Sequence, residues 1–349
     1  MQDKCGLFFC SYRAESALFP SGFQRACLAA FLLALIIIPL GINSYYVSIL
    51  CLMNIAVIGA VSLNLLTGLC GQISLGHGAF FGVGAYTAGI LAAKGVPFLV
   101  TLPASGAVAA LAGMAFGLPS LRLKGIYLAI ASLAAQLILE YVFLHWESMT
   151  GGSNGLMLMA PEIFGLKFDS DIKMFYLTLA VAALTVLAVS NITRTRPGRA
   201  FVAIRDHYLS AEIVGVNLFA GKLQAFGLSS FLAGVGGCLW AHYTNFITPE
   251  QFNIGLSINY LAMIIIGGLG SVLGAIFGAV FLTVLPEALN AVAALAGQML
   301  GGDPTASLAA LKGGVFGLVL TLFLIFEPDG LAQRWRMAKA YWKLYPFAH

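Results

Sequence analysis

The sequence predicts an all-α integral membrane protein with about ten transmembrane helices, in a range of eight to ten, some of them short or broken. Three observations predict this class. Of the 349 residues, 60% are hydrophobic and only 9% are charged, whereas a soluble domain carries about 25% charged residues. The mean hydropathy is +0.93. The apolar runs are long and continuous rather than alternating, which argues against a transmembrane β-barrel.

Ten apolar segments have the character of membrane spans. The run that follows Arg25 has no small-residue cleavage pattern close behind it, so it is kept as the first span rather than a signal peptide. The third and eighth segments are shorter than the ~20 residues of a straight crossing, and we expect one or both to be broken, tilted or partly re-entrant. The ten segments are residues 23–41, 46–67, 78–93, 98–119, 125–146, 172–191, 223–243, 256–267, 271–290 and 306–326.

The basic residues fix the expected orientation. We expect residues 1–22 and 327–349 to be cytoplasmic segments and residues 23–326 to form the membrane domain. Four of the 18 basic residues then face outward, and the other fourteen face the cytoplasm, as the positive-inside rule requires. This count also needs residues 256–290 to form two spans joined by the tight turn GGLGS. The outward residues are Lys94, Lys167, Lys173 and Lys312.

A charged segment at residues 194–222 interrupts the hydrophobic body. It contains Arg194, Arg196, Arg199, Arg205 and Lys222, with Asp206 and Glu212 as its only acids. Asp206 has the character of a helix N-cap and Gly215 that of the residue just past a helix C-terminus. The pattern predicts a short helix at residues 208–214, outside the bilayer. An ordinary charged cytoplasmic loop is the alternative.

Residues 64–87 are rich in glycine and contain no charged residue. They place Asn64, Gln72, Ser74 and His77 at or near membrane depth. Glycines permit both a helix break and close helix packing, so the polar groups either line a pathway or are satisfied inside a packed core. A pathway for a zwitterionic solute needs such hydrogen-bonding groups, together with helix termini that can face a carboxylate.

Glu140 lies inside the apolar run at residues 125–146. A carboxylate within a span is costly and suggests a function by default, which makes Glu140 a second candidate for the pathway. A paired or snorkelling structural role is the rival reading, because His145 and Trp146 mark the membrane boundary close by.

A stripe of small residues begins the ninth span. Gly270, Gly274 and Gly278 recur every four residues, which predicts one helix face that packs closely on a neighbour. The spacing is not that of a dinucleotide-binding loop, and no strand precedes it.

The sequence shows no enzyme site. Its only Gly-Lys dipeptide, Gly221-Lys222, lacks both the earlier glycine and the following Ser or Thr of a P-loop. The six cysteines show no metal-ligand spacing, and we expect neither a metal nor a cofactor on this chain. The net charge of +4 gives no indication of nucleic acid binding.

Several segments together resemble the LivM-type permeases of high-affinity branched-chain amino acid ABC importers, in order over about residues 45–332. They are GQISLGHGAFFGVGAYTAGIL, YLAIASLAAQ, HWESMTGGSNG, RTRPGRAFVAIRDHYLSAEIVGVN, AFGLSSFLAGVGGCLWAHYTNFITPEQF, IIIGGLGSVLGAIFGA and FEPDGL.

The resemblance implies a multi-pass protein of the bacterial inner membrane. It implies four partner chains: a related LivH-type permease as heterodimer partner, two cytoplasmic ATPase subunits that hold ATP and Mg, and a periplasmic or lipid-anchored solute-binding protein. Membrane lipid surrounds the spans. In such permeases the loop after the sixth span docks on the ATPase, so Arg199, Arg205, Asp206, Glu212 and Gly215 become candidate coupling residues.

The substrate stays open at this point. Members of the family carry branched-chain amino acids, other amino acids, aromatic acids, or urea and short amides. Two functions of other classes are also open: an ion-coupled secondary transporter, in which Glu140 would titrate with transport, and a membrane scaffold or receptor. An ATPase that co-purifies with the chain would favour the importer.

Overall fold

The structure is a computed structural model that describes residues 22–120, 125–163 and 165–300, then 314, 317–318, 320–323, 325–327 and 329–344. Its long helices are α2 (Gly22–Ile37), α3 (Ser44–Leu63), α4 (His77–Ala93), α5 (Phe98–Ser120), α6 (Ile126–His145), α8 (Asp171–Ile192), α9 (Arg196–Ile213), α10 (Leu218–Thr244), α11 (Ile254–Gly267), α12 (Val272–Leu300) and α14 (Leu331–Leu344).

Six of the described helices are long and apolar enough to cross a membrane. They are α3 with its continuation, α5, α6, α8, α10 and α12. Helices α2, α4 and α11 have 16, 17 and 14 residues and are shorter than a straight span. The expected tenth span at 306–326 lies mostly outside the described residues, as do residues 1–21. The helical membrane class is confirmed, while the count of ten and the cytoplasmic termini stay predictions.

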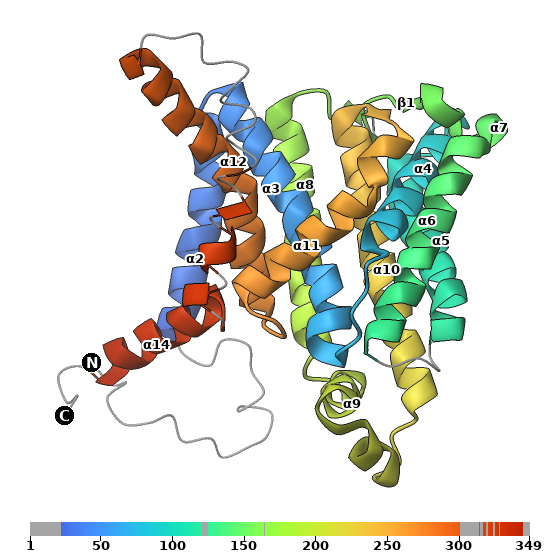
Figure 1. Cartoon of the computed structure of the whole chain (residues 1–349). Helices are drawn as coiled ribbons and strands as arrows, with labels where there is room; N and C mark the ends of the chain where they lie inside the picture. The colour runs from blue at the N-terminus through green and yellow to red at the C-terminus, as the bar shows by residue number, and fades with distance from the viewer. Residues whose placement is uncertain are drawn as a thin grey trace.

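Helices α3 and α10 occupy the middle of the bundle. Helix α10 packs against α3, α4 and α5, and α3 packs against α8 and α12. Figure 1 shows α11 crossing the centre obliquely, with α4, α5, α6 and α10 gathered on one side and α2 and α12 on the other. The core between them is apolar and fully buried, with Ile58 and Leu63 of α3, Phe81 of α4 and Leu239 of α10. This packing fixes the elements that carry the polar groups described below.

The second span does not end as an ordinary helix. After Leu63 the chain continues as a π-helical turn, η2 (Asn64–Leu69), and residues 71–76 have no regular helix before α4 begins at His77. π-Helical turns are uncommon and are often found at functional sites. The glycine-rich segment therefore contains a helix break between two buried helices.

Residues 256–290 form two helices joined by a tight turn, as expected, while the prediction that both cross the membrane is not tested. Helix α11 ends at Gly267 and α12 begins at Val272, so residues 268–271 make the turn. A Cβ on Gly274 would lie 2.6 Å from the carbonyl oxygen of Gly267, and one on Gly278 would lie 1.8 Å from that of Met263. The two helices thus approach at a distance that only glycine permits at these positions. Gly270, expected on the same helix face, instead lies in the turn with φ +78°.

Replacing Gly274 with Leu should destabilise the protein by about 1–3 kcal/mol or more, because the added side chain must push α12 away from the α11 backbone. Ile276→Leu, two positions along the same helix, is the matched control and should cost less than about 1.5 kcal/mol. Thermal unfolding of the purified protein in one detergent measures both. Equal midpoints for the two variants would contradict close packing at Gly274.

The short strands of the described residues belong to segments that connect the long helices. Strand β1 (Leu156–Met157) pairs antiparallel with β4 (Phe246–Ile247), and β2 (Glu162–Ile163) pairs with β3 (Leu166–Lys167). Figure 1 shows β1 and the short helix α7 (Glu147–Thr150) at one end of the molecule, with α9 at the opposite end. The first of these ends is the one expected to face outward.

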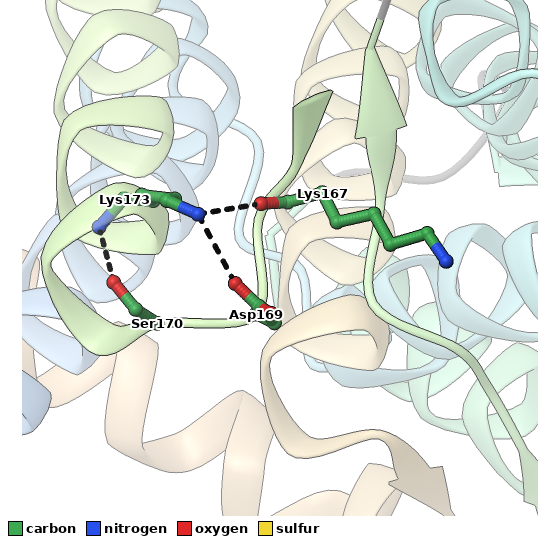
Figure 2. A network of polar contacts seen from close by, with 4 residues as sticks. All are labelled: Lys167, Asp169, Ser170 and Lys173. Atoms are coloured by element: carbon green, nitrogen blue, oxygen red, sulfur yellow. Dashed lines mark hydrogen bonds and ion pairs between the residues drawn. The ribbon is translucent and has the colours of Figure 1, made fainter. Parts of the chain in front are cut away.

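A polar network fixes the start of α8 beside strand β3 (Figure 2). The Lys173 Nζ donates to the Lys167 carbonyl at 3.1 Å and to Asp169 Oδ1 at 3.2 Å, and the Ser170 hydroxyl accepts from the Lys173 amide. The hydrogen bond from Lys173 holds the pKa of the Asp169 carboxyl below its usual value. Its small stabilising effect is therefore present at neutral pH and is lost as the pH falls through that lowered pKa. Since both side chains are exposed, the pair mainly sets local geometry.

Candidate functional site

Helix α9 and the break at residues 64–76 form the candidate site. Helix α9 is longer than the sequence predicted. It begins at Arg196, with Pro197 in its first turn, and runs to Ile213, because proline is well suited to the start of a helix. His207 breaks it into two parts, with φ −156° and ψ 93°.

The expected N-cap at Asp206 is wrong by one residue. The imidazole Nδ1 of His207 accepts from the Ser210 amide at 3.4 Å, which is the capping position for the second part of α9. The Asp206 carboxylate instead accepts from Arg205 Nε at 2.9 Å. Histidine is not a usual capping residue, so the sequence pattern favoured the neighbouring aspartate.

Gly215 ends α9 as the sequence predicted. Its φ is +90°, its amide donates to the Glu212 carbonyl, and the amide of Val216 donates to that of Ala211, both at 2.9 Å. These two hydrogen bonds are those of a Schellman motif, whose left-handed position favours glycine. The cap turns the chain sharply from α9 toward α10.

The turn presents an apolar tip to solvent, formed by Ile213 and Val214. Their exposed fractions are 86% and 83%. Beside this tip lies a groove of about 1150 Å³, whose lining includes Glu212, Gly215 and Lys222 from the predicted charged segment. An exposed apolar patch that is rimmed by polar residues is a candidate contact surface.

Arg205 connects α9 to the membrane helices. Its guanidinium Nη1 donates to the Gly68 carbonyl of η2 at 2.9 Å. A Cβ on Gly71 would lie 2.8 Å from Arg205 Cγ, and one on Gly270 would lie 2.8 Å from Nη1. One side chain of α9 therefore lies against both the break after α3 and the α11–α12 turn. The other predicted arginine, Arg199, donates within its own segment to the Arg194 carbonyl at 3.0 Å.

Asn64 joins the same two elements from inside the bundle. Its Nδ2 donates to the Ser271 carbonyl at 3.1 Å, and its Oδ1 accepts from the Gly270 amide at 2.9 Å. The side chain is fully buried. Both polar ends of the amide are thus used to bind the α11–α12 turn, which makes Asn64 a link between helices.

The other polar residues of the glycine-rich segment are also buried and hydrogen-bonded. His77 Nε2 lies 3.0 Å from the Ser62 hydroxyl and 3.1 Å from the Gly59 carbonyl. The Gln72 amide nitrogen contacts Cys70 Sγ at 3.4 Å, and the Ser74 hydroxyl accepts from the Gly76 amide at 3.3 Å. In this conformation the four predicted residues lie within the packed segment and are closed to solvent.

The first turn of α4 is capped by side chains from two other helices. The Gly78 amide donates to Ser257 Oγ at 2.7 Å, and the Ala79 amide donates to Gln136 Oε1 at 2.8 Å. Gln136 also donates to the Phe252 carbonyl at 2.6 Å. Free amides at a helix start inside a membrane would be costly, so these two side chains make the break at residues 71–76 possible.

Glu140 is not part of this cluster. It lies one turn beyond Gln136 on α6 and is half-buried. Among the residues that the structure describes, no hydrogen bond or ion pair joins Glu140 to the residues of the break. No metal-binding group of His, Cys, Asp and Glu occurs among the described residues.

Sequence reasoning missed Gln136 and Ser257 as caps, and Ile213 and Val214 as an exposed tip. The sequence does contain a signal for the exposed tip, because two β-branched residues stand in a charged segment just before a predicted C-cap glycine. The caps had none, because which distant side chain meets a helix start depends on the packing of α4, α6 and α11.

Comparison with known proteins gives a consistent result. The family model described as "Branched-chain amino acid transport system / permease component" matches residues 45–324. The LivM permease protein of the high-affinity branched-chain amino acid transport system of Escherichia coli K12 is 31% identical over 333 residues, covering 88% of this chain and 75% of that protein. Its counterpart from Salmonella typhimurium LT2 is 31% identical, covering 86% of this chain and 74% of that protein.

A more distant relative is also similar over most of the chain. The autoinducer 2 import system permease protein LsrC of Enterobacter sp. strain 638 is 28% identical, covering 75% of this chain and 78% of that protein. No solved structure matches the chain.

Proposed function

Because the chain belongs to the branched-chain amino acid transport system permease family, we propose that it forms part of the membrane pathway of an ATP-driven importer of branched-chain amino acids in the bacterial inner membrane. The proposed mechanism rests on one observation, the structure of helix α9. It combines an exposed apolar tip with an arginine that contacts the helix break in the membrane.

The apolar tip at Ile213 and Val214 is the docking point for a cytoplasmic ATPase subunit. Such a surface is costly to leave in water and gains free energy when a partner covers it. Glu212 and Lys222 line the adjacent groove and supply charges around the apolar contact, as the polar rim does in protein interfaces. ATP and Mg belong to that separate chain, and this chain holds no nucleotide.

Arg205 and Asn64 provide the route from the ATPase to the pathway. A movement of α9 pulls on Gly68 through Arg205, and Asn64 joins the same region to the α11–α12 turn. The Schellman cap at Gly215 fixes the direction in which α10 follows α9. Coupling of this kind requires an element with two discrete arrangements. We assign that role to residues 64–76, which comprise the π-helical turn η2 and the non-helical residues 71–76.

The opposite end of the molecule is assigned to the solute-binding protein. Met157 and Met159 are 85% and 88% exposed there, next to the paired strands β1 and β4. Methionine is flexible and adapts to different partner shapes. A second, related permease completes the membrane pathway, and the binding protein supplies most of the substrate selectivity.

The pathway assignment of Ser74 predicts a state-dependent thiol. Ser74→Cys should transport, and the new thiol should react with a small hydrophilic reagent in at least one state of the cycle, after which uptake stops. Substrate-loaded binding protein with ATP should change the rate of modification, because Ser74 is fully buried in the present conformation. A thiol that stays unreactive in every state would leave the segment with a packing role only.

The docking of α9 is tested by a cysteine at Ile213 in a variant whose native cysteines are serine. A membrane-impermeant thiol reagent should label it in inside-out vesicles stripped of the ATPase subunit and leave it unlabelled in intact cells. A bifunctional reagent should then join it to the ATPase subunit. Labelling from outside intact cells would contradict the proposed orientation, and a cytoplasmic thiol without any cross-link would contradict docking.

A further inference from the structure

An open apolar groove lies between α12 and α14, and none of its lining residues belongs to α9 or to residues 64–76. Its volume is about 630 Å³. It is lined by Phe277, Phe281 and Val284 of α12 and by Leu331, Trp335 and Ala338 of α14. The rings of Phe277 and Trp335 meet edge to face at 6.0 Å, yet 54% of Trp335 is exposed. The groove is therefore preformed, and none of the residues that the structure describes closes it over.

Helix α14 has two contrasting faces. Its sequence LAQRWRMAKAYWKL contains four basic residues and no acid. Leu331, Trp335 and Ala338 follow the i, i+4, i+7 spacing of one helix face, and Arg336, Lys339 and Lys343 follow i, i+3, i+7 on another. A basic amphipathic helix with aromatic residues on its apolar face is typical of a helix that lies in the surface of an anionic membrane.

The position of α14 agrees with a membrane surface. Its start lies against the α11–α12 turn, where a Cβ on Gly268 would be 3.3 Å from Ala332 Cβ. Figure 1 shows α14 at the same end of the molecule as α9. The groove thus begins near the level at which α12 enters the apolar body, and its wall continues along α12 as far as Ala288. A groove that opens beside α14 and runs along the apolar span α12 has the shape that an acyl chain requires.

We propose that this groove binds an acyl chain of an anionic phospholipid from the leaflet on the α9 side of the membrane, with Arg336 and Lys339 facing the headgroups. The apolar lining fits the acyl chain, and the exposed cations Arg336 and Lys339 complement anionic headgroups. Arg334 also lines the groove, but its charge is paired with Glu327. The family model ends at residue 324, so α14 belongs to no part of the matched family region.

The test uses the complete transporter complex purified from membranes and placed in nanodiscs of phosphatidylcholine with a minor fraction of phosphatidylglycerol. Either lipid carries a photoreactive diazirine in its acyl chain, and mass spectrometry locates the cross-linked residues. The phosphatidylglycerol probe should label residues 277–288 and 331–338 more strongly than the phosphatidylcholine probe. Ala338→Trp, which fills the groove, should lower labelling about tenfold, since the acyl chain loses its apolar contact area.

Two controls separate the groove from general effects. Ala340→Trp places the same side chain on the same helix at an exposed position outside the groove and should leave labelling unchanged. The double variant R336Q/K339Q should reduce the preference for phosphatidylglycerol about twenty-five-fold, because each of the two cations near the surface contributes about a fivefold preference. It should leave phosphatidylcholine labelling unchanged.

Three results would overturn the proposal. Equal labelling by the two probes would show that the groove does not select anionic lipid. Groove residues left unlabelled in the complete complex would show that protein covers the groove, either this chain or a partner. Equal effects of the Trp substitutions at 338 and 340 would show that the lipid lies elsewhere.

Discussion

Replacing Ile213 with Asp should abolish capture of the ATPase subunit by this permease without affecting its insertion in the membrane. The side chain is 86% exposed at the tip of α9, so folding of the chain does not depend on it. In the complex it would be buried in the partner, where loss of a central apolar contact costs about 2 kcal/mol or more, a factor of about thirty in affinity. A carboxylate left unpaired in the interface adds a desolvation cost.

Association of the purified permease with the ATPase subunit at rising ATPase concentrations measures this effect. Leu166→Asp is the matched control, because Leu166 is also an exposed apolar residue. It lies in strand β3, next to the polar network at the start of α8, at the end of the molecule that is expected to face outward. The control should retain full ATPase binding. Unchanged affinity in the Ile213 variant would exclude the α9 tip as the docking point.

Replacing Asn64 with Leu should lower the free energy of unfolding more than replacing Asn54, a polar residue of the same span, with Leu. Leucine has a similar size but leaves the Gly270 amide without its acceptor, and it removes one of two hydrogen bonds to the Ser271 carbonyl, which still accepts from the Ala275 amide. A buried group left without its hydrogen bond costs about 1–3 kcal/mol, so we expect a loss near the upper end of that range. The α11–α12 turn would also lose its connection to the helix break, so stimulation of the ATPase by loaded binding protein should fall.

Thermal unfolding in one detergent gives the stability, and Asn54→Leu provides the matched control. Asn54 lies on the same helix and makes one side-chain hydrogen bond, to Thr178 Oγ1 at 3.3 Å, in a half-buried position. Its replacement should cost about 1 kcal/mol. If the two leucine variants unfold at the same temperature, Asn64 does not link the helices in the way described.

Local patterns with a strong physical cause were predicted well from the sequence. The C-cap at Gly215 could be recognised because a left-handed position strongly favours glycine. The turn between α11 and α12 could be placed because two helices over residues 256–290, rather than one, put the basic C-terminal segment on the side that the positive-inside rule favours. The cap is decided by one short segment, whereas the turn was placed from the distribution of basic residues along the whole chain.

Features that depend on contacts between distant segments could not be predicted. Asn64 was expected in a pathway, but its amide meets backbone groups more than 200 residues away. The caps of α4 from Gln136 and Ser257 have the same origin. The start of α9 was predicted too late, at residue 208, because Asp206 resembled a helix N-cap. The helix begins at Arg196, where Pro197 favours a helix start. The role of the break in transport stays a prediction.

Uptake of a radiolabelled branched-chain amino acid by vesicles that contain the complete reconstituted complex tests the central claim most directly. The vesicles hold the solute-binding protein with labelled leucine on the outer side of the permease, and ATP on the α9 side. We expect accumulation of leucine only with hydrolysable ATP, and none with the Ile213→Asp permease. Uptake that proceeds without ATP and follows an imposed ion gradient would contradict the account and identify a secondary transporter.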